Sequence, residues 1–111
     1  MKRQDAEYLT YAARSIDYVL EWTSAGREHF LRETQAREAV LYRLHTLTQA
    51  LRELSVERKR RYPEVPFAVM SGFRNVLVHD FIRLDLDKIW EVVEVHVPAL
   101  KPQVVRMMAE L

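Results

Sequence analysis

Residues 66–84 read PFAVMSGFRNVLVHDFIRL, and the side-chain pattern of this stretch decides the fold. On a helix that advances by about 100° per residue, one apolar stripe predicts a core face: Met70, Phe73, Leu77, Phe81 and Leu84. The opposite side carries small and polar residues: Ala68, Gly72, Asn75, His79 and Arg83. A second, partly apolar flank lies between them: Ser71, Val78 and Ile82. This helix is therefore expected to pack against a second copy of the chain or to lie at the centre of a monomeric bundle, and periodicity favours neither.

Apolar residues at helical spacing predict further helices on both sides of this stretch. One covers residues 5–22, and another runs from Thr34, a plausible N-cap, into the charged run at residues 57–61. A short helical turn is expected around residues 28–32. Residues 62–66 contain two prolines and predict an extended linker.

Two more helices are expected in the C-terminal part. Asp85 is a reasonable cap for the first of them, and Pro98 is expected to open the second. The stretch VVEVHV at residues 92–97 is rich in β-branched residues, but its helical context favours a helix. The fold class is therefore all-α, and 111 residues predict a single domain over residues 1–111.

Composition limits the function classes. Lys and Arg total 17 against 16 for Asp and Glu, so any contact with nucleic acid needs a local concentration of positive charge. There is no cysteine, which excludes disulfides and thiolate metal sites. His29, His45 and His96 are scattered without ligand spacing, so neither a metal site nor a cofactor is expected. The sequence shows no secretory signal and no membrane span, which predicts a cytoplasmic protein.

The polar residues of the decisive stretch are the candidates for chemistry. Asn75 and His79 are four residues apart and lie on one helix face. Arg74 and His79 are five apart, or about 140° around the axis, so one helix does not place their side chains together. Either the long arginine side chain wraps around the helix, or a symmetry-related copy supplies the second member of the pair.

Residues 62–101 resemble the HepT toxins of the HEPN superfamily. The signature is an arginine, four intervening residues and a histidine, with a polar residue after the arginine: Arg74, Asn75 and His79. Four flanking segments are also similar to those of the family, namely Ser71-Gly72-Phe73, Leu84-Asp85-Leu86, Ile89-Trp90-Glu91 and Val97-Pro98. Upstream, QAREAV at residues 35–40 resembles the start of the family's second long helix, so the resemblance covers nearly the whole chain.

The resemblance implies an antiparallel bundle of four to five helices that forms a homodimer, with a composite site at the interface. It also implies metal-independent RNA cleavage and pairing with a minimal nucleotidyltransferase antitoxin. In one branch of the family, this antitoxin adenylylates a tyrosine two residues after the histidine. Here that position is Phe81, which has no hydroxyl to modify and falls on the predicted core stripe. Another tyrosine could serve, binding alone could neutralise the protein, or this member is not regulated as a toxin.

These residue types suit the cleavage of RNA, which carries its own 2′-hydroxyl nucleophile. His79 is expected to act as general acid and base, and Arg74 to stabilise charge on the phosphate, while Asn75 orients His79 or binds a phosphate oxygen. Additional contacts to RNA are expected from basic residues: Arg58, Lys59, Arg60, Arg61 and Arg83. For the run at residues 58–61, a solvated helix end is an equally good interpretation. The alternative function is a non-catalytic helical module that binds or assists a nucleotidyltransferase.

Overall fold

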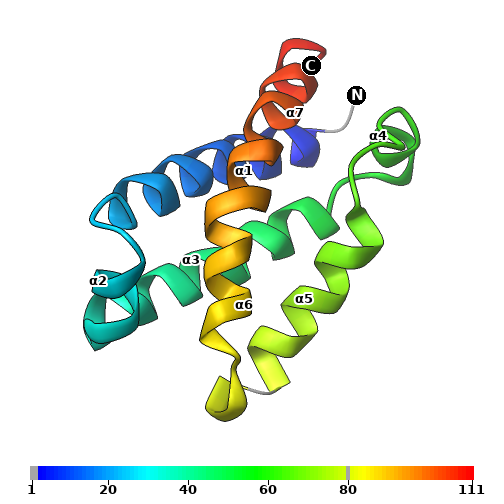
Figure 1. Cartoon of the computed structure of the whole chain (residues 1–111). Helices are drawn as coiled ribbons and strands as arrows, with labels where there is room; N and C mark the ends of the chain where they lie inside the picture. Colours follow the sequence, from blue (N-terminus) through cyan, green and yellow to red (C-terminus); the bar gives the residue numbers. More distant parts are fainter. Residues whose placement is uncertain (1–2, 80) are drawn as a thin grey trace.

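Helices account for all the regular structure in the computed structural model, which describes residues 3–79 and 81–111. The two longest are α1 (Arg3–Trp22) and α3 (Thr34–Arg52). They run in opposite directions because the chain reverses at the short helix α2 (Arg27–Arg32), as Figure 1 shows. Gly26 precedes α2 and has φ +98°. Residues other than glycine adopt this backbone conformation only at a cost in free energy. The short helix expected around residues 28–32 is thus confirmed.

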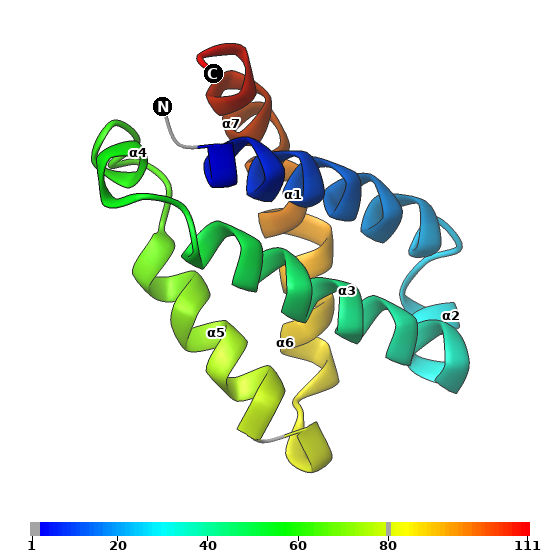
Figure 2. The same ribbon diagram turned by 180° about the vertical axis from the view of Figure 1, so that it is seen from behind.

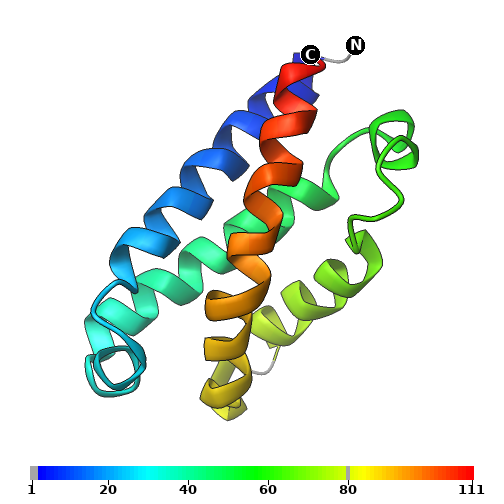
Figure 3. The same ribbon diagram turned by 45° about the horizontal axis from the view of Figure 1, so that its top comes forward.

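The core lies where α1, α3 and α7 (Val97–Ala109) meet. Figure 3 shows α1 and α7 side by side, with α3 packed against α1. The apolar stripes of these helices form one core cluster and are almost fully buried: Leu9, Ile16 and Val19 of α1, Val40, Leu44, Leu47 and Leu51 of α3, and Leu100, Val104 and Met107 of α7. Burial of this apolar surface is the main force that holds the helices together.

The charged run at residues 57–61 does not continue the long helix, although the sequence predicted that it would. Helix α3 ends at Arg52, and a separate helix, α4 (Val56–Arg60), begins after a turn. Ser55 is the N-cap of α4, because its Oγ accepts a hydrogen bond from the backbone N–H of Arg58 at 3.2 Å. The same hydroxyl donates to Asp5 on α1 at 2.6 Å, so a tertiary contact fixes the break.

Helix α5 (Phe67–His79) covers most of the stretch that decides the fold. It packs on α3, while the C-terminal helical segment at residues 86–109 lies apart from it, as Figure 2 shows from behind. Met70 and Leu77 are buried and Phe73 is half-buried, which confirms this part of the predicted core stripe. The opposite side, from Ala68 to His79, is exposed. The helix ends earlier than expected, and the 3-10 turn η1 (Phe81–Arg83) follows.

Ile82 does not join the partly apolar flank that the pattern predicted. It lies in η1 rather than in a continued α-helix, and its side chain is 83% exposed. Ser71 and Val78, the other two residues of that flank, are half-buried as expected. The early end of α5 therefore turns Ile82 out into solvent.

The last helices form one continuous rod rather than two separate helices. Asp85 caps α6 (Leu86–Glu91), as predicted, by accepting from the backbone N–H groups of Asp87 and Lys88. A π-helical stretch, η2 (Val92–His96), leads directly into α7 without a turn. Pro98 lies in the first turn of α7, where its missing N–H is tolerated, so it continues the rod instead of opening an independent helix. No helix of the described residues is long and apolar enough to cross a membrane.

Candidate active site on helix α5

Arg74 is half-buried at the side of α5 that faces α3. Its Nε donates a hydrogen bond to Oε1 of Gln49 on α3 at 2.9 Å. Its Nη1 donates to Oδ1 of the neighbouring Asn75 at 3.2 Å. Two neutral amides thus hold the guanidinium between α5 and α3.

The charge of Arg74 has no counter-ion among the described residues, where no carboxylate lies within ion-pair distance of it. Other arginines of the chain pair with carboxylates: Arg27 with Asp87, Arg32 with Glu33, Arg58 with Asp5 and Arg106 with Glu64. A guanidinium held by neutral acceptors keeps its full charge for an incoming anion. A phosphate, which accepts two parallel hydrogen bonds from arginine, fits it best.

His79 is the last residue of α5, and its side chain is exposed. Asn75, also exposed, lies one turn earlier on the same face. No hydrogen bond joins His79 to Arg74, whose side chain is directed to α3 instead. The structure therefore keeps the separation of about 140° that the spacing predicts, and it does not show the arginine wrapped around the helix.

The exposed face of α5 is more apolar than a solvated helix face usually is. Val69 and Val76 are 71% and 44% exposed on it, and Ile82, in the 3-10 turn beyond the helix end, is 83% exposed. Gly72 lies between the two valines, and a Cβ at this position would meet nothing within 4 Å. Contacts inside the chain therefore do not require a glycine here. Contiguous apolar surface of this kind usually marks an interaction site.

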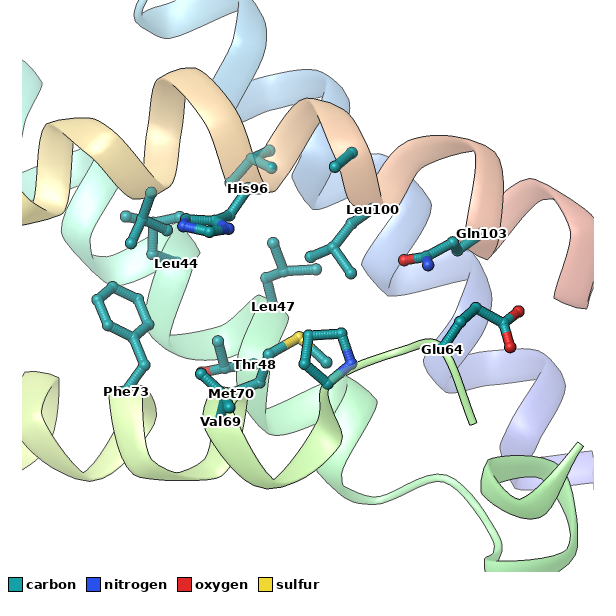
Figure 4. Close-up of a pocket in the computed structure, with 14 residues that line it drawn as sticks. Leu44, Leu47, Thr48, Glu64, Val69, Met70, Phe73, His96, Leu100 and Gln103 are labelled. Atoms are coloured by element: carbon teal, nitrogen blue, oxygen red, sulfur yellow. The ribbon is translucent and has the colours of Figure 1, made fainter. Parts of the chain in front are cut away.

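A groove of about 320 Å³ runs beside this face, between α5 and the rod of η2 and α7. Figure 4 shows Val69, Met70 and Phe73 on its α5 side, with His96 and Leu100 across it on the rod. Leu44 and Leu47 of α3 form its floor, so the lining is mostly apolar. The groove thus extends the uncovered apolar surface from the outer face of α5 towards α7.

The basic residues predicted to contact RNA differ in their exposure. Arg58 is only 2% exposed and its Nε lies 3.7 Å from Oδ2 of Asp5, so it is a buried structural residue and cannot contact RNA in this fold. Lys59 is half-buried and donates to the backbone carbonyl of Arg52. Arg60 and Arg61 are exposed near the start of α5, and Arg83 is exposed beyond its end.

One residue of this site was missed by the reasoning from sequence. Gln49 flanks the apolar stripe of α3, and nothing in its local pattern distinguishes it from other polar helix residues. Only the packing of α5 on α3 brings it to Arg74. The side chain of Phe81 lies outside the described part of the structure, so the packing role predicted for it stays a prediction. Across the described residues, no three His, Asp or Glu side chains form a group that could hold a metal ion.

Comparison with known proteins places this chain in a family. The family described as ribonuclease HepT-like matches residues 10–107. A "Probable ribonuclease HepT" of Thermococcus cleftensis is 30% identical over 102 residues, which are 91% of this chain and 93% of that protein. A "Gamma-glutamylcyclotransferase and putative RNase" of Methanocaldococcus jannaschii is 28% identical over 112 residues, and the chain spans 50% of its length. No solved structure shows a significant match. Because the family match covers nearly the whole chain, the chain belongs to the HepT-like ribonuclease family.

Proposed function

We propose that this protein is a metal-independent ribonuclease whose catalytic site combines Arg74 and His79 from two subunits. The proposal depends on one observation about Arg74. Gln49 and Asn75 hold its guanidinium, and no carboxylate of the described residues pairs with it. An exposed histidine lies on the same helix. Family membership supports the choice of RNA as the substrate.

The chemistry needs two kinds of group, and both are present. Cleavage begins when a base removes the proton of the 2′-hydroxyl, whose oxygen then attacks the adjacent phosphorus. The 5′-oxygen leaves with a proton from an acid, and a 2′,3′-cyclic phosphate remains. His79 moves these protons, because imidazole titrates near neutral pH. Arg74 stabilises the negative charge that grows on the phosphate oxygens, which is often the largest single contribution to catalysis.

Two subunits are required because one helix holds the two side chains apart. Arg74 is anchored towards α3, whereas His79 points away from it by about 140°. On the helix wheel, the flank of α5 that carries Ser71 and Val78 lies between the two side chains, so a two-fold axis beside this flank would bring the His79 of one subunit to the Arg74 of the other. The absence of a side chain at Gly72 supports a close approach of the second α5 helix, and the exposed Val69 and Val76 add apolar surface beside it.

The positive charge around this face supports an RNA path along α5. The helix has 13 residues and is therefore about 20 Å long at a rise of about 1.5 Å per residue. Arg60 and Arg61 lie exposed near its start and Arg83 beyond its end. We assign these three arginines to the RNA backbone on either side of the scissile phosphate.

The first experiment measures cleavage of labelled RNA by Arg74→Ala and His79→Ala in the presence of EDTA. Each variant should lose activity by about a hundredfold or more, because each lacks one part of the chemistry. Arg14→Ala and His29→Ala, which lie on α1 and α2, are the matched controls and should keep wild-type activity. Full activity of His79→Ala, or cleavage that EDTA abolishes, would contradict the proposal.

A mixed dimer tests whether the site is shared. One subunit carries Arg74→Ala with one affinity tag, the other carries His79→Ala with a second tag, and the doubly tagged dimer is purified. In a shared arrangement one of the two sites regains both residues, so about half of the wild-type activity returns. If each subunit uses its own pair, neither site is complete and the mixed dimer stays inactive.

Gly72→Gln tests the interface itself. Gly72 is exposed and a Cβ at this position would meet nothing within 4 Å, so a long polar side chain can extend into solvent and the fold should persist. It should block close packing of two α5 helices and give a monomer in sedimentation velocity. Ala109→Gln, at the exposed end of α7, is the control and should remain dimeric. A wild-type protein that is monomeric at micromolar concentration would exclude the shared site.

We further propose that the protein acts as a toxin and is paired with a nucleotidyltransferase antitoxin, as its resemblance to HepT implies. Induced expression in a bacterial host should then stop growth, and His79→Ala should abolish the effect. Co-expression with a nucleotidyltransferase encoded beside it should restore growth. Growth arrest that His79→Ala retains would favour the alternative, a helical module that acts through its partner without cleaving RNA.

A further inference from the structure

We propose that Gln49 is a positioning residue that sets the orientation of the Arg74 guanidinium. Its functional consequence rests on the proposed ribonuclease activity, but its structural part does not. The starting point is the hydrogen bond from Arg74 Nε to Gln49 Oε1 at 2.9 Å, which joins α5 to α3. Neither the family resemblance nor the sequence pattern singled out Gln49.

The amide of Gln49 is itself held in one orientation. Its Nε2 donates to Oε1 of Glu53, the C-cap residue that follows the last residue of α3, at 2.9 Å. An ionised carboxylate can only accept hydrogen bonds, so Glu53 must take the amide N–H and not the amide oxygen. The oxygen is therefore left for Arg74. Glu53 thus fixes which end of Gln49 the arginine meets, without itself lying within ion-pair distance of Arg74.

The two bonds of Arg74 decide which of its edges remains available. A guanidinium has five N–H groups, one on Nε and two on each terminal nitrogen. Gln49 occupies the Nε group, and Asn75 occupies one of the two on Nη1. The second group on Nη1 and both groups on Nη2 have no partner among the described residues. These groups form the end of the fork, which can hold two oxygens of one phosphate. Gln49 thus closes the Nε edge and directs this end towards the substrate.

The positioning role of Gln49 also depends on the fact that its side chain is uncharged. A glutamate here would accept the same hydrogen bond, but it would place a full negative charge about 3 Å from the guanidinium. That charge would repel a phosphate and offset the attraction of Arg74. A glutamine anchors the arginine and leaves its charge unopposed, whereas an apolar residue of similar length would leave the arginine unanchored.

Two variants separate anchoring from charge. Gln49→Met keeps the length of the side chain and removes the acceptor, so kcat for RNA cleavage should fall about tenfold to a hundredfold with KM within about twofold. Gln49→Glu keeps an acceptor and adds a charge, so KM should rise at least about fivefold as well. Gln35→Met, on the exposed first turn of α3, is the matched control and should change neither constant. If Gln49→Met retains wild-type kcat, the positioning role is wrong.

A spectroscopic measurement tests the anchor without relying on activity. In ¹H–¹⁵N spectra of arginine Nε groups, the Arg74 signal should be slow to exchange with water in the wild-type protein. It is assigned by its disappearance in Arg74→Lys. The signal should exchange at least about tenfold faster in Gln49→Met, while the melting temperature stays close to that of Gln35→Met. Unchanged exchange would overturn the proposal. If the wild-type protein cleaves no RNA, the proposed function fails, but this measurement still decides whether Gln49 holds Arg74.

Discussion

Arg58 and Arg74 differ in their burial and in the charge of the groups that they contact. Arg58 lies at the junction of α1 and α4 with 2% of its side chain exposed, and it pairs with the equally buried Asp5. Asp5 also accepts hydrogen bonds from the backbone N–H and the hydroxyl of Ser55, at 2.8 and 2.6 Å. Arg74 is half-buried between α3 and α5 and binds only neutral amides among the described residues.

The difference separates a charge that is paired inside the fold from a charge that remains open to a ligand. A buried charge needs a counter-charge and hydrogen bonds, because it has lost its hydration. Asp5 supplies the counter-charge to Arg58, so the charge of Arg58 is neutralised inside the fold. Arg74 keeps access to solvent and needs no counter-charge, so its positive potential remains available to a ligand. Three substitutions test this distinction.

The largest effect on stability is expected at the buried ion pair between Arg58 and Asp5. Asp5→Ala removes the counter-ion of Arg58 and leaves its charge buried, so the free energy of unfolding should fall by about 3–5 kcal/mol. Urea denaturation followed by circular dichroism measures this change. Asp17→Ala breaks only the exposed ion pair with Lys101 and should lower stability by less than about 1 kcal/mol. If both variants lost the same free energy of unfolding, the buried ion pair of Arg58 would contribute no more to stability than an exposed one.

Substitution of the partly exposed Arg74 should lower the activity of the protein rather than its stability. Arg74→Lys keeps the charge but replaces the fork with a single ammonium, so RNA cleavage should fall about a hundredfold. Its unfolding free energy should change by less than about 1 kcal/mol, because only two hydrogen bonds to partly exposed amides are altered. Arg14→Lys, at an exposed position on α1, is the control and should retain activity within about twofold. A lysine at residue 74 that supports full cleavage would mean that charge alone is needed there.

The smallest effect concerns Tyr62, which is buried close to Arg58 and donates a hydrogen bond to Glu110. Burial raises the pKa of this phenol above 10.0, and the hydrogen bond to Glu110 raises it further. The protonated phenol is therefore favoured in the folded state, and its contribution is present below pH 10 and lost as pH rises through the raised pKa. Tyr62→Phe should lose about 1 kcal/mol at pH 7.

The same substitution predicts a change of behaviour in alkali. Above about pH 10 the wild-type protein should lose stability more steeply than Tyr62→Phe, because only the wild type must keep this buried phenol protonated. Denaturation curves at several pH values give the comparison. Parallel losses in both proteins would show that Tyr62 does not differ from the exposed tyrosines.

Periodicity predicted the faces of the helices well because it reports which residues are buried. It identified the inner and outer sides of α5, with Met70 and Leu77 buried and His79 exposed. It did not predict the end of α3 at Arg52, because the break depends on a contact between Ser55 and Asp5, which is 50 residues away. The charged residues that follow are good helix formers, so no local signal marks the interruption.

The site was predicted only in part, for the same reason. The family resemblance singled out Arg74, Asn75 and His79, whose residue types suit phosphate chemistry, and their spacing predicted that one helix would keep the arginine and the histidine apart. Sequence could not tell that Arg58 is buried whereas its neighbours Arg60 and Arg61 are exposed. Nor could it bring Gln49 to Arg74, because that contact exists only once α5 has packed on α3.

The π-helical stretch at Val92–His96 has a consequence for insertions and deletions. In such a stretch hydrogen bonds span five residues, as the bond from Val97 N–H to the Val92 carbonyl does, so the backbone contains more residues per turn than an α-helix. A π-helical turn holds about one residue more than an α-helical turn, so removing one residue here should convert the turn to α-helix and leave the residues after it close to their present faces. Removing one residue from a regular α-helical part of the rod would instead rotate everything after it by about 100°, and Val104 and Met107 would turn away from the core. The rod should therefore tolerate the loss of a residue best in a segment that includes neither Arg74 nor His79.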